Sequence, residues 1–415
     1  MTLRFQPWIL VAALVAWASV PAVAQHGAKA ATGPDNDTCL ACHGDPAAKS
    51  DSGRAIGLDA DKFHASVHGA IGLACVDCHV DLKKTTDFPH AEKLAPVNCA
   101  TCHDAAVAAY STSIHAAARR QTPDSVAATC VDCHSAHEIR SSKDPESRTY
   151  PLNLPATCAR CHGDPNIIAQ GHIRIGNVAD LYKDSIHGRA VSKSGLLVAA
   201  NCTSCHGSHD IRQRTDPASH VFRANIPATC GSCHEGIKTQ YDSGIHGSAL
   251  AAGSTHAPVC ADCHTAHDIQ RADVTSWRLS VIRECGTCHA DKIKTYRDTF
   301  HGQVTSLGFV RVAMCSDCHG AHAIFPKTDT RSSVANGHLL ETCRTCHPTA
   351  TAGFAEYDPH ADKTNAARNP VLYYAAVFMK WLLIGVFGFF GLHTTLWLPR
   401  SYTARRAHDK EMRTS

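Results

Sequence analysis

Cysteine and histidine are the residues whose types and spacing could do chemistry in this chain. All 22 cysteines fall into eleven copies of the pattern Cys-x-x-Cys-His, with none left over. Two thiols three positions apart, followed by an imidazole, match a haem group: the thiols form thioethers with its two vinyl groups, and the histidine binds the iron. The copies are Cys39/Cys42/His43, Cys75/Cys78/His79, Cys99/Cys102/His103, Cys130/Cys133/His134, Cys158/Cys161/His162, Cys202/Cys205/His206, Cys230/Cys233/His234, Cys260/Cys263/His264, Cys285/Cys288/His289, Cys315/Cys318/His319 and Cys343/Cys346/His347.

Zinc binding, a redox-active dithiol and a structural disulfide are the other common uses of a Cys-x-x-Cys pair. None of them requires histidine at the next position. Histidine accounts for 30 of the 415 residues, about 7%, so its presence after all eleven pairs is not a coincidence. We therefore expect eleven covalently attached haems c, with the motif histidines as the proximal iron ligands.

The composition indicates how so many haems fit into the chain. Residues 25–369 provide about 31 residues per haem, and aromatic residues make up only 6% of the sequence. The porphyrins must then provide much of the buried apolar surface, so haem binding contributes directly to folding. The net charge of +3 does not favour nucleic acid as a partner.

The N-terminal segment is typical of an export signal. Arg4 precedes an apolar run from Trp8 to Trp17, and an A-x-A cleavage site ends at Ala24, before Gln25. Residues 1–24 are therefore expected to be a signal peptide, and a retained anchor helix is the less favoured alternative. Export agrees with the attachment of haem c on the outer side of the energy-conserving membrane.

A second apolar segment lies near the C-terminus, where residues 370–399 are expected to form a transmembrane helix. Its uninterrupted part, Trp381 to Leu398, has 18 residues. It would span about 27 Å, enough to cross the hydrocarbon layer of a bilayer. The basic residues within 400–415 predict a cytoplasmic tail. The haem domain, residues 25–369, would then lie in the periplasm, anchored to the inner (cytoplasmic) membrane and its lipid.

Between these ends the motifs alternate between two kinds, which predicts tandem two-haem repeats of about 58 residues. The first kind starts at Cys39, Cys99, Cys158, Cys230, Cys285 and Cys343. It is followed by helix formers and by an aromatic residue five positions before a histidine, as in Tyr110/His115. The second kind is compact, as in CADCHTAHDI, with a histidine three positions after the motif histidine. These patterns predict a mainly α-helical fold with extensive loops.

The extra histidines number eleven, one for each haem, and we interpret them as distal iron ligands. The candidates are His68, His90, His115, His137, His187, His209, His246, His267, His301, His322 and His360. Among them, His90 and His360 lie in a context that departs from the rest. Five further histidines fit neither repeat position: His64, His172, His220, His256 and His338.

Spacing also indicates which haem each distal histidine serves. His234 and His246 are 12 residues apart, about 18 Å along a single helix, too far to bind one iron from both sides. His264 and His267 are three residues apart and would point the same way from one helical face. Each distal histidine should therefore reach a neighbouring haem. The glycine that follows four of these histidines is expected at a helix C-terminus.

The doubled motifs within residues 36–360 resemble the multihaem cytochromes that include periplasmic pentahaem and decahaem electron carriers and, more distantly, octahaem tetrathionate reductases and hydroxylamine oxidoreductases. The resemblance implies a helical, loop-rich chain around a row of haems in parallel-stacked and perpendicular pairs. Enzymes of this superfamily usually keep one iron open or bound by lysine. This chain has no Cys-x-x-Cys-Lys motif, and its ligand tally leaves no obvious vacancy, which disfavours catalysis.

His393 lies inside the expected transmembrane helix, where ionisable side chains are usually functional. One hypothesis makes it a ligand to a haem b, or a contact to a quinol site, shared with a separate cytochrome b or quinol-oxidising subunit. The stretch GLHTTLWLPRSY resembles the first helix of such subunits. The alternative is a histidine that packs against a partner helix or faces the headgroups.

The sequence thus predicts a protein that relays electrons through bis-histidine haems, between a membrane quinol or cytochrome b partner and a periplasmic or outer-membrane acceptor. No residue is assigned a catalytic role. An enzyme with one open haem, acting on nitrogen or sulfur compounds, is the alternative, and a haem store or structural anchor is a third. The residues do not fix the direction of electron flow.

Overall fold

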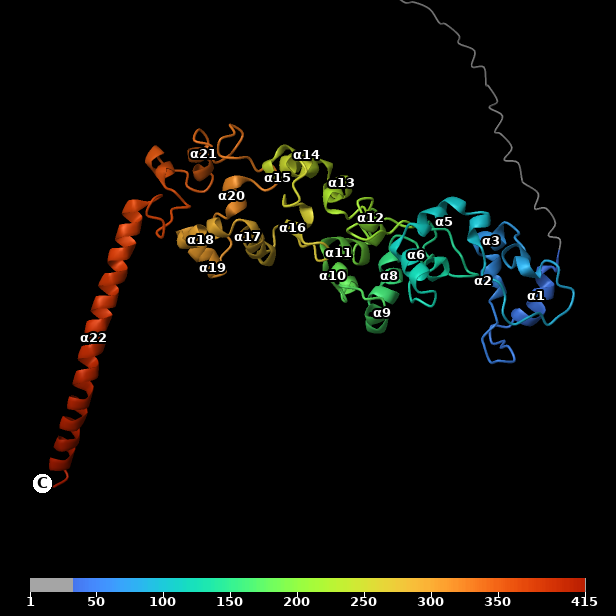
Figure 1. Ribbon diagram of the computed structural model, residues 1–415, viewed down its shortest axis with the longest axis horizontal. Coiled ribbons are helices and arrows are strands. Elements are labelled where there is room, and N and C mark those ends of the chain that lie inside the picture. The colour runs from blue at the N-terminus through green and yellow to red at the C-terminus, as the bar shows by residue number, and fades with distance from the viewer. Residues whose placement is uncertain (1–32, 415) are drawn as a thin grey trace, which may run out of the picture. The chain divides into compact units, whose positions relative to one another are not determined.

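A computed structural model of the chain describes residues 33–414. These residues form short helices joined by long loops and contain no β-strand, apart from one isolated bridge between Lys49 and Ala55 (Figure 1). The mainly helical, loop-rich fold predicted from the sequence is confirmed. The expected signal peptide, residues 1–24, lies outside the described residues.

The described chain divides into two compact units. Unit 1 comprises residues 33–104 and 134–141, and unit 2 comprises residues 105–133 and 142–414. The helices of unit 1 are α1 (Asn36–His43), α2 (Ala60–His64), α3 (Val67–Ala70), α4 (Cys75–Cys78), and the 3-10 helices η1 (Val80–Leu82) and η2 (Cys99–Thr101).

Unit 2 contains the longer run of helices. They are α5 (Asp104–Ser111), α6 (Ile114–Gln121), α7 (Cys130–His134), α8 (Leu154–His162), α9 (Pro165–Gln170), α10 (Val178–Asp184), α11 (Ile186–Ser192), α12 (Cys202–His206), η3 (Arg223–Asn225), α13 (Ile226–Gly231), α14 (Glu235–Ser243), α15 (Ile245–Ala251), α16 (Cys260–His264), α17 (Thr275–Cys288), α18 (Ala290–Asp298), α19 (Phe300–Ser306), α20 (Cys315–His319), α21 (Leu339–Arg344), η4 (Ala352–Glu356) and α22 (Pro370–Glu411). Helices α5 and α7 each extend by one residue across the division between the units.

The protein itself provides very little apolar core. Only twelve hydrophobic side chains are buried among the described residues, and seven of these are alanines or valines. The one cluster of buried apolar side chains among the described residues consists of Ile282, Ile293, Tyr296 and Met314. A chain of this length normally buries most of the surface that it exposes when unfolded, so these helices need another source of apolar contact.

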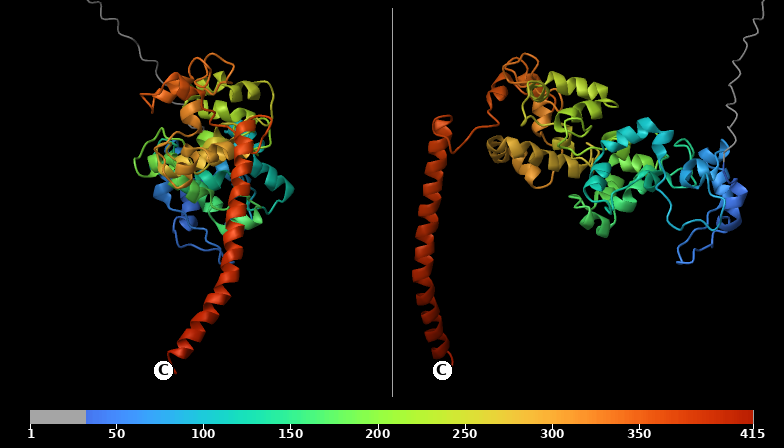
Figure 2. Two further views of the ribbon diagram at one scale, coloured as in Figure 1. Left: turned by 90° about the vertical axis from the view of Figure 1, so that its left-hand side faces the viewer. Right: turned by 45° about the vertical axis from the view of Figure 1, so that its right-hand side comes forward.

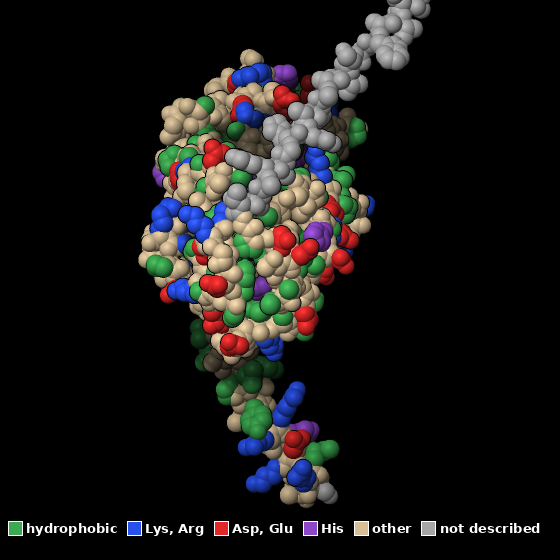
Figure 3. Space-filling view, turned by 90° about the vertical axis from the view of Figure 1, so that its right-hand side faces the viewer, with side chains coloured by type: hydrophobic (Ala, Val, Ile, Leu, Met, Phe, Trp, Pro, Cys, Tyr) green, Lys and Arg blue, Asp and Glu red, His purple; other side chains and the backbone are tan. Residues whose placement is uncertain are grey.

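Helix α22 differs from every other described element in length and composition. It runs without interruption from Pro370 to Glu411, through Pro399, and is apolar enough to cross a membrane (Figure 2). Lys and Arg side chains gather at its C-terminal end (Figure 3). The tail expected from residue 400 onward is not a separate element, because the same helix continues for twelve residues beyond Pro399.

We predict that the chain without its haems does not hold this fold. The reason is the small apolar core, since cofactor contacts must replace the missing side-chain contacts. Far-UV circular dichroism of a haem-free preparation should show much less helix than the haem-loaded protein. Native helix content in the haem-free chain would contradict the prediction.

Candidate functional site

The motifs of the second kind fold into helices of about one turn. In α4, α7, α16 and α20, the aspartate before the second cysteine accepts a hydrogen bond from the backbone N–H of the residue before the first cysteine. In α16, Val259 N lies 2.7 Å from Asp262 Oδ2. The carboxylate thus satisfies an N–H at the helix N-terminus, where negative charge is favourable. This local cap fixes both cysteines and the motif histidine on one short helix.

The chain turns sharply after the motif histidine of the second kind. The next residue has a positive φ in four copies: Ser135 (65°), Gly207 (80°), Thr265 (63°) and Gly320 (79°). Helix α16 therefore ends at His264, and His267 lies beyond the helix end. The expectation that His264 and His267 share one helical face is wrong. The left-handed residue reverses the chain direction, and this turn sends the two imidazoles to different partners.

The histidines that follow the first kind lie at corners between two helices. Helices α5/α6, α10/α11, α14/α15 and α18/α19 each meet at such a helical corner, with α2/α3 as a shorter version. The second helix begins with Ser66, Ser113, Ser185 or Thr299 as N-cap, whose hydroxyl accepts a backbone N–H three residues on, at 3.0–3.1 Å. The distal histidine is the second residue of that helix. The Ser or Thr two positions before four of these histidines was the sequence signal for this start, whereas Gly244 takes that position before His246.

The glycine after the histidine has a different role from the one expected. Gly69, Gly188, Gly247 and Gly302 lie near the start of a helix, so their expected place at a helix C-terminus is wrong. A Cβ atom on Gly188 would lie 1.9 Å from the backbone oxygen of Tyr182, and one on Gly247 would lie 2.3 Å from that of Tyr241. The absence of a side chain lets the two helices of the corner approach closely. Likewise, His234 and His246 are not separated by a single 12-residue helix.

The structure brings each of ten proximal candidates next to one of ten distal candidates. The ring centres of each pair lie 5.9–6.3 Å apart. The pairs are His43–His90, His103–His68, His79–His137, His162–His115, His234–His187, His206–His267, His289–His246, His264–His322, His347–His301 and His319–His360.

This separation has the width of one metal ion. Two metal–imidazole bonds of about 2.0 Å, with about 1.2 Å from each nitrogen to its ring centre, place the centres about 6.4 Å apart. Offset or edge-to-face ring contacts can have the same separation, with ring centres about 4.5–7 Å apart, but here every one of the ten pairs joins a motif histidine to a distal candidate. Each pair therefore leaves room for one ion between two axial imidazoles.

The remaining ligands of such an ion are not protein side chains. Among residues 33–414, no group of three or more His, Cys, Asp or Glu side chains is arranged to hold a metal. A structural zinc site uses four protein ligands, so the zinc interpretation does not fit. A haem does fit, because its porphyrin provides four equatorial nitrogens and leaves two axial positions open.

The electrostatics of the pairs favour neutral imidazole, the form that binds a metal ion. Burial lowers the pKa of His115 and His206, and the opposite ring, His162 or His267, lowers it further. The same causes lower the pKa of His187 and His246.

The pairing follows a rule that the sequence did not reveal. A proximal histidine of the first kind pairs with the distal histidine that follows the preceding first-kind motif, as in His234–His187. A proximal histidine of the second kind meets the distal histidine of the following second-kind motif, as in His206–His267. The two series therefore run in opposite directions along the chain. Each of the ten pairs joins different motifs, as expected.

The ends of the array use histidines from outside the repeats. His43 has no preceding corner and faces His90, and His319 has no following second-kind motif and faces His360. This explains why these two distal candidates lie in an unusual sequence context. His134 and His209 belong to different units, and their assignment as ligands stays a prediction from the sequence.

A recurring backbone hydrogen bond couples the two series of distal histidines. The residue before four of the five corner histidines donates its N–H to the carbonyl of the isoleucine two positions after a second-kind distal histidine, at 2.7–2.8 Å. The bonds are Val67–Ile139, Ile114–Ile211, Ile186–Ile269 and Ile245–Ile324. Sequence reasoning missed these isoleucines, although the recurring His-x-Ile was visible.

The tyrosines of the corners hold the second-kind motifs in place. Tyr110, Tyr182, Tyr241 and Tyr296 each donate their hydroxyl to the carbonyl two positions before the first cysteine of the next motif, at 2.7–3.0 Å. The aromatic residue five positions before the distal histidine therefore fixes the distance between corner and motif. In the first copy Phe63 takes this position and has no hydroxyl.

Cysteines of successive motifs are neighbours within each unit. The Cys158 side chain neighbours that of Cys202, and the pairs Cys230–Cys260 and Cys285–Cys315 are neighbours in the same way. In unit 1, burial and the nearby Cys39 raise the pKa of Cys75 to about 11. Since each thiol attaches the edge of one porphyrin, adjacent thiols bring two porphyrin edges together.

A second contact type links the remaining successive motifs. Cys78 lies close to Cys99 and Cys102 in unit 1. In unit 2, Cys133 neighbours Cys158 and Cys161, Cys205 neighbours Cys233, Cys263 neighbours Cys285, and Cys318 neighbours Cys343 and Cys346. Successive motifs within a unit therefore follow one another in space in the order of the chain.

The protein leaves the second cysteine of most first-kind motifs exposed. In α1, Cys39 is half-buried, whereas Cys42, one turn further along the same helix, is open to solvent. The same holds for the second cysteines Cys102, Cys233, Cys288 and Cys346, while Cys161 is half-buried. Burial by protein therefore does not support the thioether role expected of Cys42. That role stays a prediction from its place in the motif, two positions after Leu40 and directly before His43.

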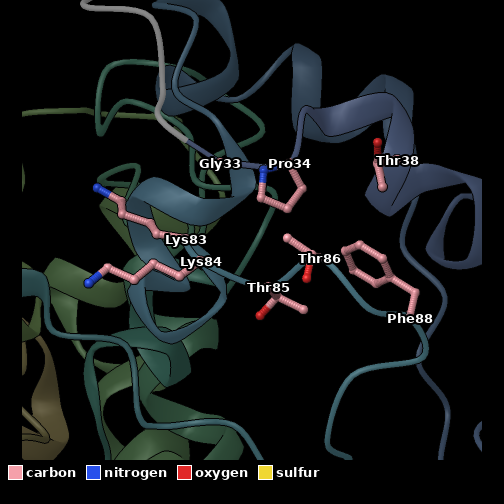
Figure 4. Close-up of a pocket in the computed structure, with 8 residues that line it drawn as sticks. All are labelled: Gly33, Pro34, Thr38, Lys83, Lys84, Thr85, Thr86 and Phe88. Carbon is pink, nitrogen blue, oxygen red and sulfur yellow. The ribbon is translucent and has the colours of Figure 1, made fainter.

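A cavity lies beside helix α1 in unit 1. It measures about 370 Å³ and is lined by Pro34, Thr38 and Phe88, among others (Figure 4). Thr38 precedes Cys39, and the Phe88 ring lies 6.5 Å from the His90 ring. In Figure 4 the ammonium groups of Lys83 and Lys84 point away from the cavity.

His393 lies on α22, apart from these pairs. Its described ring contact is with Phe389 on the same helix, at 6.5 Å. The hypotheses for His393 require a partner subunit and are taken up below.

Two family models match parts of the chain. Residues 67–163 match cytochrome c3, and residues 196–239 match the doubled CXXCH motif. No curated protein and no solved structure matches the chain. With the eleven Cys-x-x-Cys-His motifs, these matches identify the chain as a multihaem c-type cytochrome. It binds haem c and its function is electron transfer.

We predict that Gly247→Ala destabilises the corner between α14 and α15. The added Cβ would meet the backbone of Tyr241 and Asp242, and overpacking of this kind costs about 1–3 kcal/mol. Ala116 occupies the same position in the α5/α6 corner, so we expect opening of the corner rather than loss of folding. The measurement is thermal unfolding followed by haem absorbance.

Gly236→Ala is the matched control, in the same helix α14. Its Cβ would meet nothing within 4 Å, and replacing a helical glycine with alanine should stabilise by about 0.5–1 kcal/mol. Equal stability of the two variants would show that the close approach at Gly247 is unimportant.

We predict that Thr295 sets the orientation of His360. Thr295 Oγ1 lies 3.1 Å from His360 Nδ1 and within 3.0–3.2 Å of two backbone oxygens, those of Asp291 and Lys292. The hydroxyl donates its proton to a backbone oxygen and accepts from Nδ1–H, which leaves Nε2 free to bind iron.

Thr295→Val should therefore weaken iron binding at this position, by about 10–100-fold if it resembles other residues that orient metal ligands. Electron paramagnetic resonance of the oxidised protein should show a new high-spin signal from one haem, and Thr295→Ser should remove it. A valine variant with the wild-type spectrum would contradict this role.

Proposed function

We propose that this cytochrome carries eleven covalently bound bis-histidine haems c and relays electrons along them. The proximal ligands are the eleven motif histidines, and the distal ligands are the eleven further histidines named from the sequence. The observation that carries the proposal is the set of ten opposed imidazole pairs with ring centres 5.9–6.3 Å apart.

Two axial imidazoles suit electron transfer rather than bond chemistry. The iron stays six-coordinate and low-spin in both oxidation states, so little rearrangement accompanies each transfer. Neighbouring cysteines in successive motifs support close porphyrin edges, which shorten each transfer step within a unit. No imidazole pair among the ten favours the alternative enzyme with an open haem.

The cellular setting is part of the proposal. Residues 1–24 act as a signal peptide, residues 25–369 form the haem domain in the periplasm, residues 370–399 cross the inner membrane, and residues 400–415 are cytoplasmic. The length and apolar character of α22 support the anchor. The basic residues at its end support the orientation.

The partners follow from this setting. A membrane cytochrome b or quinol-oxidising subunit exchanges electrons with the haems, and a periplasmic or outer-membrane redox protein exchanges them at the other side. His393 on α22 contacts a haem b or a quinol site of the membrane partner. Isolation of the full chain in mild detergent, followed by mass spectrometry, should recover a cytochrome b or quinol-oxidising subunit.

The haem count and ligation predict two measurements on the purified protein. The intact mass should exceed that of residues 25–415 by eleven haem increments. Electron paramagnetic resonance of the oxidised protein should show low-spin haem, because every iron has two imidazoles. A smaller mass would refute the count, and a stoichiometric high-spin signal would favour the enzyme with one open haem.

A further inference from the structure

The segment between the last haem ligand and the membrane helix is short and firmly attached. We call residues 358–369 the membrane strap. His360 is its third residue and faces His319 across 6.2 Å. Asn369 is its last residue, and α22 begins at the next position, Pro370. A distal haem ligand and the start of the apolar helix are therefore only ten residues apart.

Three side-chain contacts tie the membrane strap to α18. His360 Nδ1 lies 3.1 Å from Thr295 Oγ1, Lys363 Nζ lies 2.9 Å from Asp298 Oδ1, and Lys294 Nζ lies 3.1 Å from Thr364 Oγ1. Thr295 is only 5% exposed. The strap is thus held against the helix that leads into the His301 corner.

Three internal contacts also close the membrane strap on itself. Arg368 pairs with Asp358 at 3.0 Å, and Asp358 also accepts the backbone N–H of His360 at 2.8 Å. Asn369 Oδ1 accepts the backbone N–H of Asp362 at 2.9 Å. The helical hydrogen bond from Tyr373 N to Asn369 O joins the strap to the first turn of α22. The ligand loop and the membrane helix therefore form one connected structure.

The position of the strap relative to a bilayer follows from helix length. Residues 370–380 precede the uninterrupted apolar run and would extend about 16 Å along the helix axis. A headgroup layer is about 5–8 Å thick on each side of the hydrocarbon core. With residues 370–399 across the membrane, at least part of this length lies in the headgroup layer, so the strap and its haem ligand stand within about 10 Å of the membrane surface.

The neighbouring site, between His301 and His347, is arranged differently. Its distal ligand comes from the α18/α19 corner, and the Phe354 ring lies against His347 with ring centres 5.0 Å apart. His347 is 23 residues before Pro370. This site has no ligand on the segment that enters the membrane.

We infer that the haem between His319 and His360 is the one that exchanges electrons with the membrane partner. The inference rests on the proposed function, in which a quinol is the reductant. Each quinol gives two electrons and two protons and becomes a quinone. The haem accepts one electron at a time, which reduces its iron from iron(III) to iron(II), and passes that electron on before the second one arrives. The protons are released to water.

The test uses His360→Met in the full chain, in membranes of the cells that produce it. Methionine keeps a sixth ligand but raises the haem potential, so an electron that arrives there is trapped. On addition of a water-soluble quinol, about one eleventh of the haem absorbance should change at the wild-type rate. The remaining ten haems should be reduced at least tenfold more slowly.

Two controls accompany this variant. His338→Met changes an exposed histidine of unit 2 outside the ring pairs and should leave the rate unchanged. Dithionite, which reduces haems without the partner, should reduce all haems of every variant. If His360→Met fails to load haem, Thr295→Val takes its place and should slow the quinol reaction, with recovery in Thr295→Ser.

Each outcome decides the question. A wild-type rate in His360→Met overturns the inference. A fast phase of two haems instead of one places the exchange at the site between His301 and His347, and also overturns it. If quinol does not reduce the wild-type haems at all, the proposed function itself fails, and that result needs no variant.

Discussion

Two neutral imidazoles that face each other across about 6 Å are the constraint on which the whole structure depends. A gap of this width suits one hexacoordinate ion, so each pair of histidines has to be held apart as well as brought together. Aspartate-capped one-turn helices hold the proximal ring in three of the pairs, those of His79, His264 and His319. Helical corners hold the distal ring in five pairs, and a turn after the motif histidine precedes it in three, those of His137, His267 and His322.

The described chain provides few other constraints. Its one apolar cluster contains four buried side chains, and the contacts between segments far apart in sequence are mostly hydrogen bonds and ring pairs. The hydroxyls of Tyr110, Tyr182, Tyr241 and Tyr296 and the carbonyls of the four isoleucines recur in register. Hydrogen bonds contribute modestly to stability but strongly to geometry, and here they set where the ligands stand.

Much of the site could be read from the sequence because its chemistry is local. The eleven motifs need only adjacent residues, and the distal candidates recur at fixed offsets from the motifs or from an aromatic residue. The pairing could not be read, because it joins residues 35–61 positions apart, as in His103–His68 and His206–His267. No periodicity within one repeat tells whether a ligand reaches forward or back along the chain.

The wrong expectations share one cause, the assumption of continuous helices. The N-cap residues Ser66, Ser113, Ser185 and Thr299 end that continuity, and so do the positive-φ residues Ser135 and Thr265. A glycine is favoured both at a helix C-terminus and where two helices come close together, so its presence in the sequence does not tell which applies. The structure decides for the close contact, because a Cβ atom on these glycines would lie against a backbone oxygen of the preceding helix.

The opposite directions of the two ligand series have a consequence for how such a protein can grow. A gene duplication that adds one motif with its own distal histidine keeps ligands and sites equal in number, but only the addition of a complete pair also keeps the alternation of the two kinds of motif. New pairs of motifs can therefore be inserted in the interior of the array. His90 and His360 remain the distal ligands at its two ends, whatever the number of motifs between them.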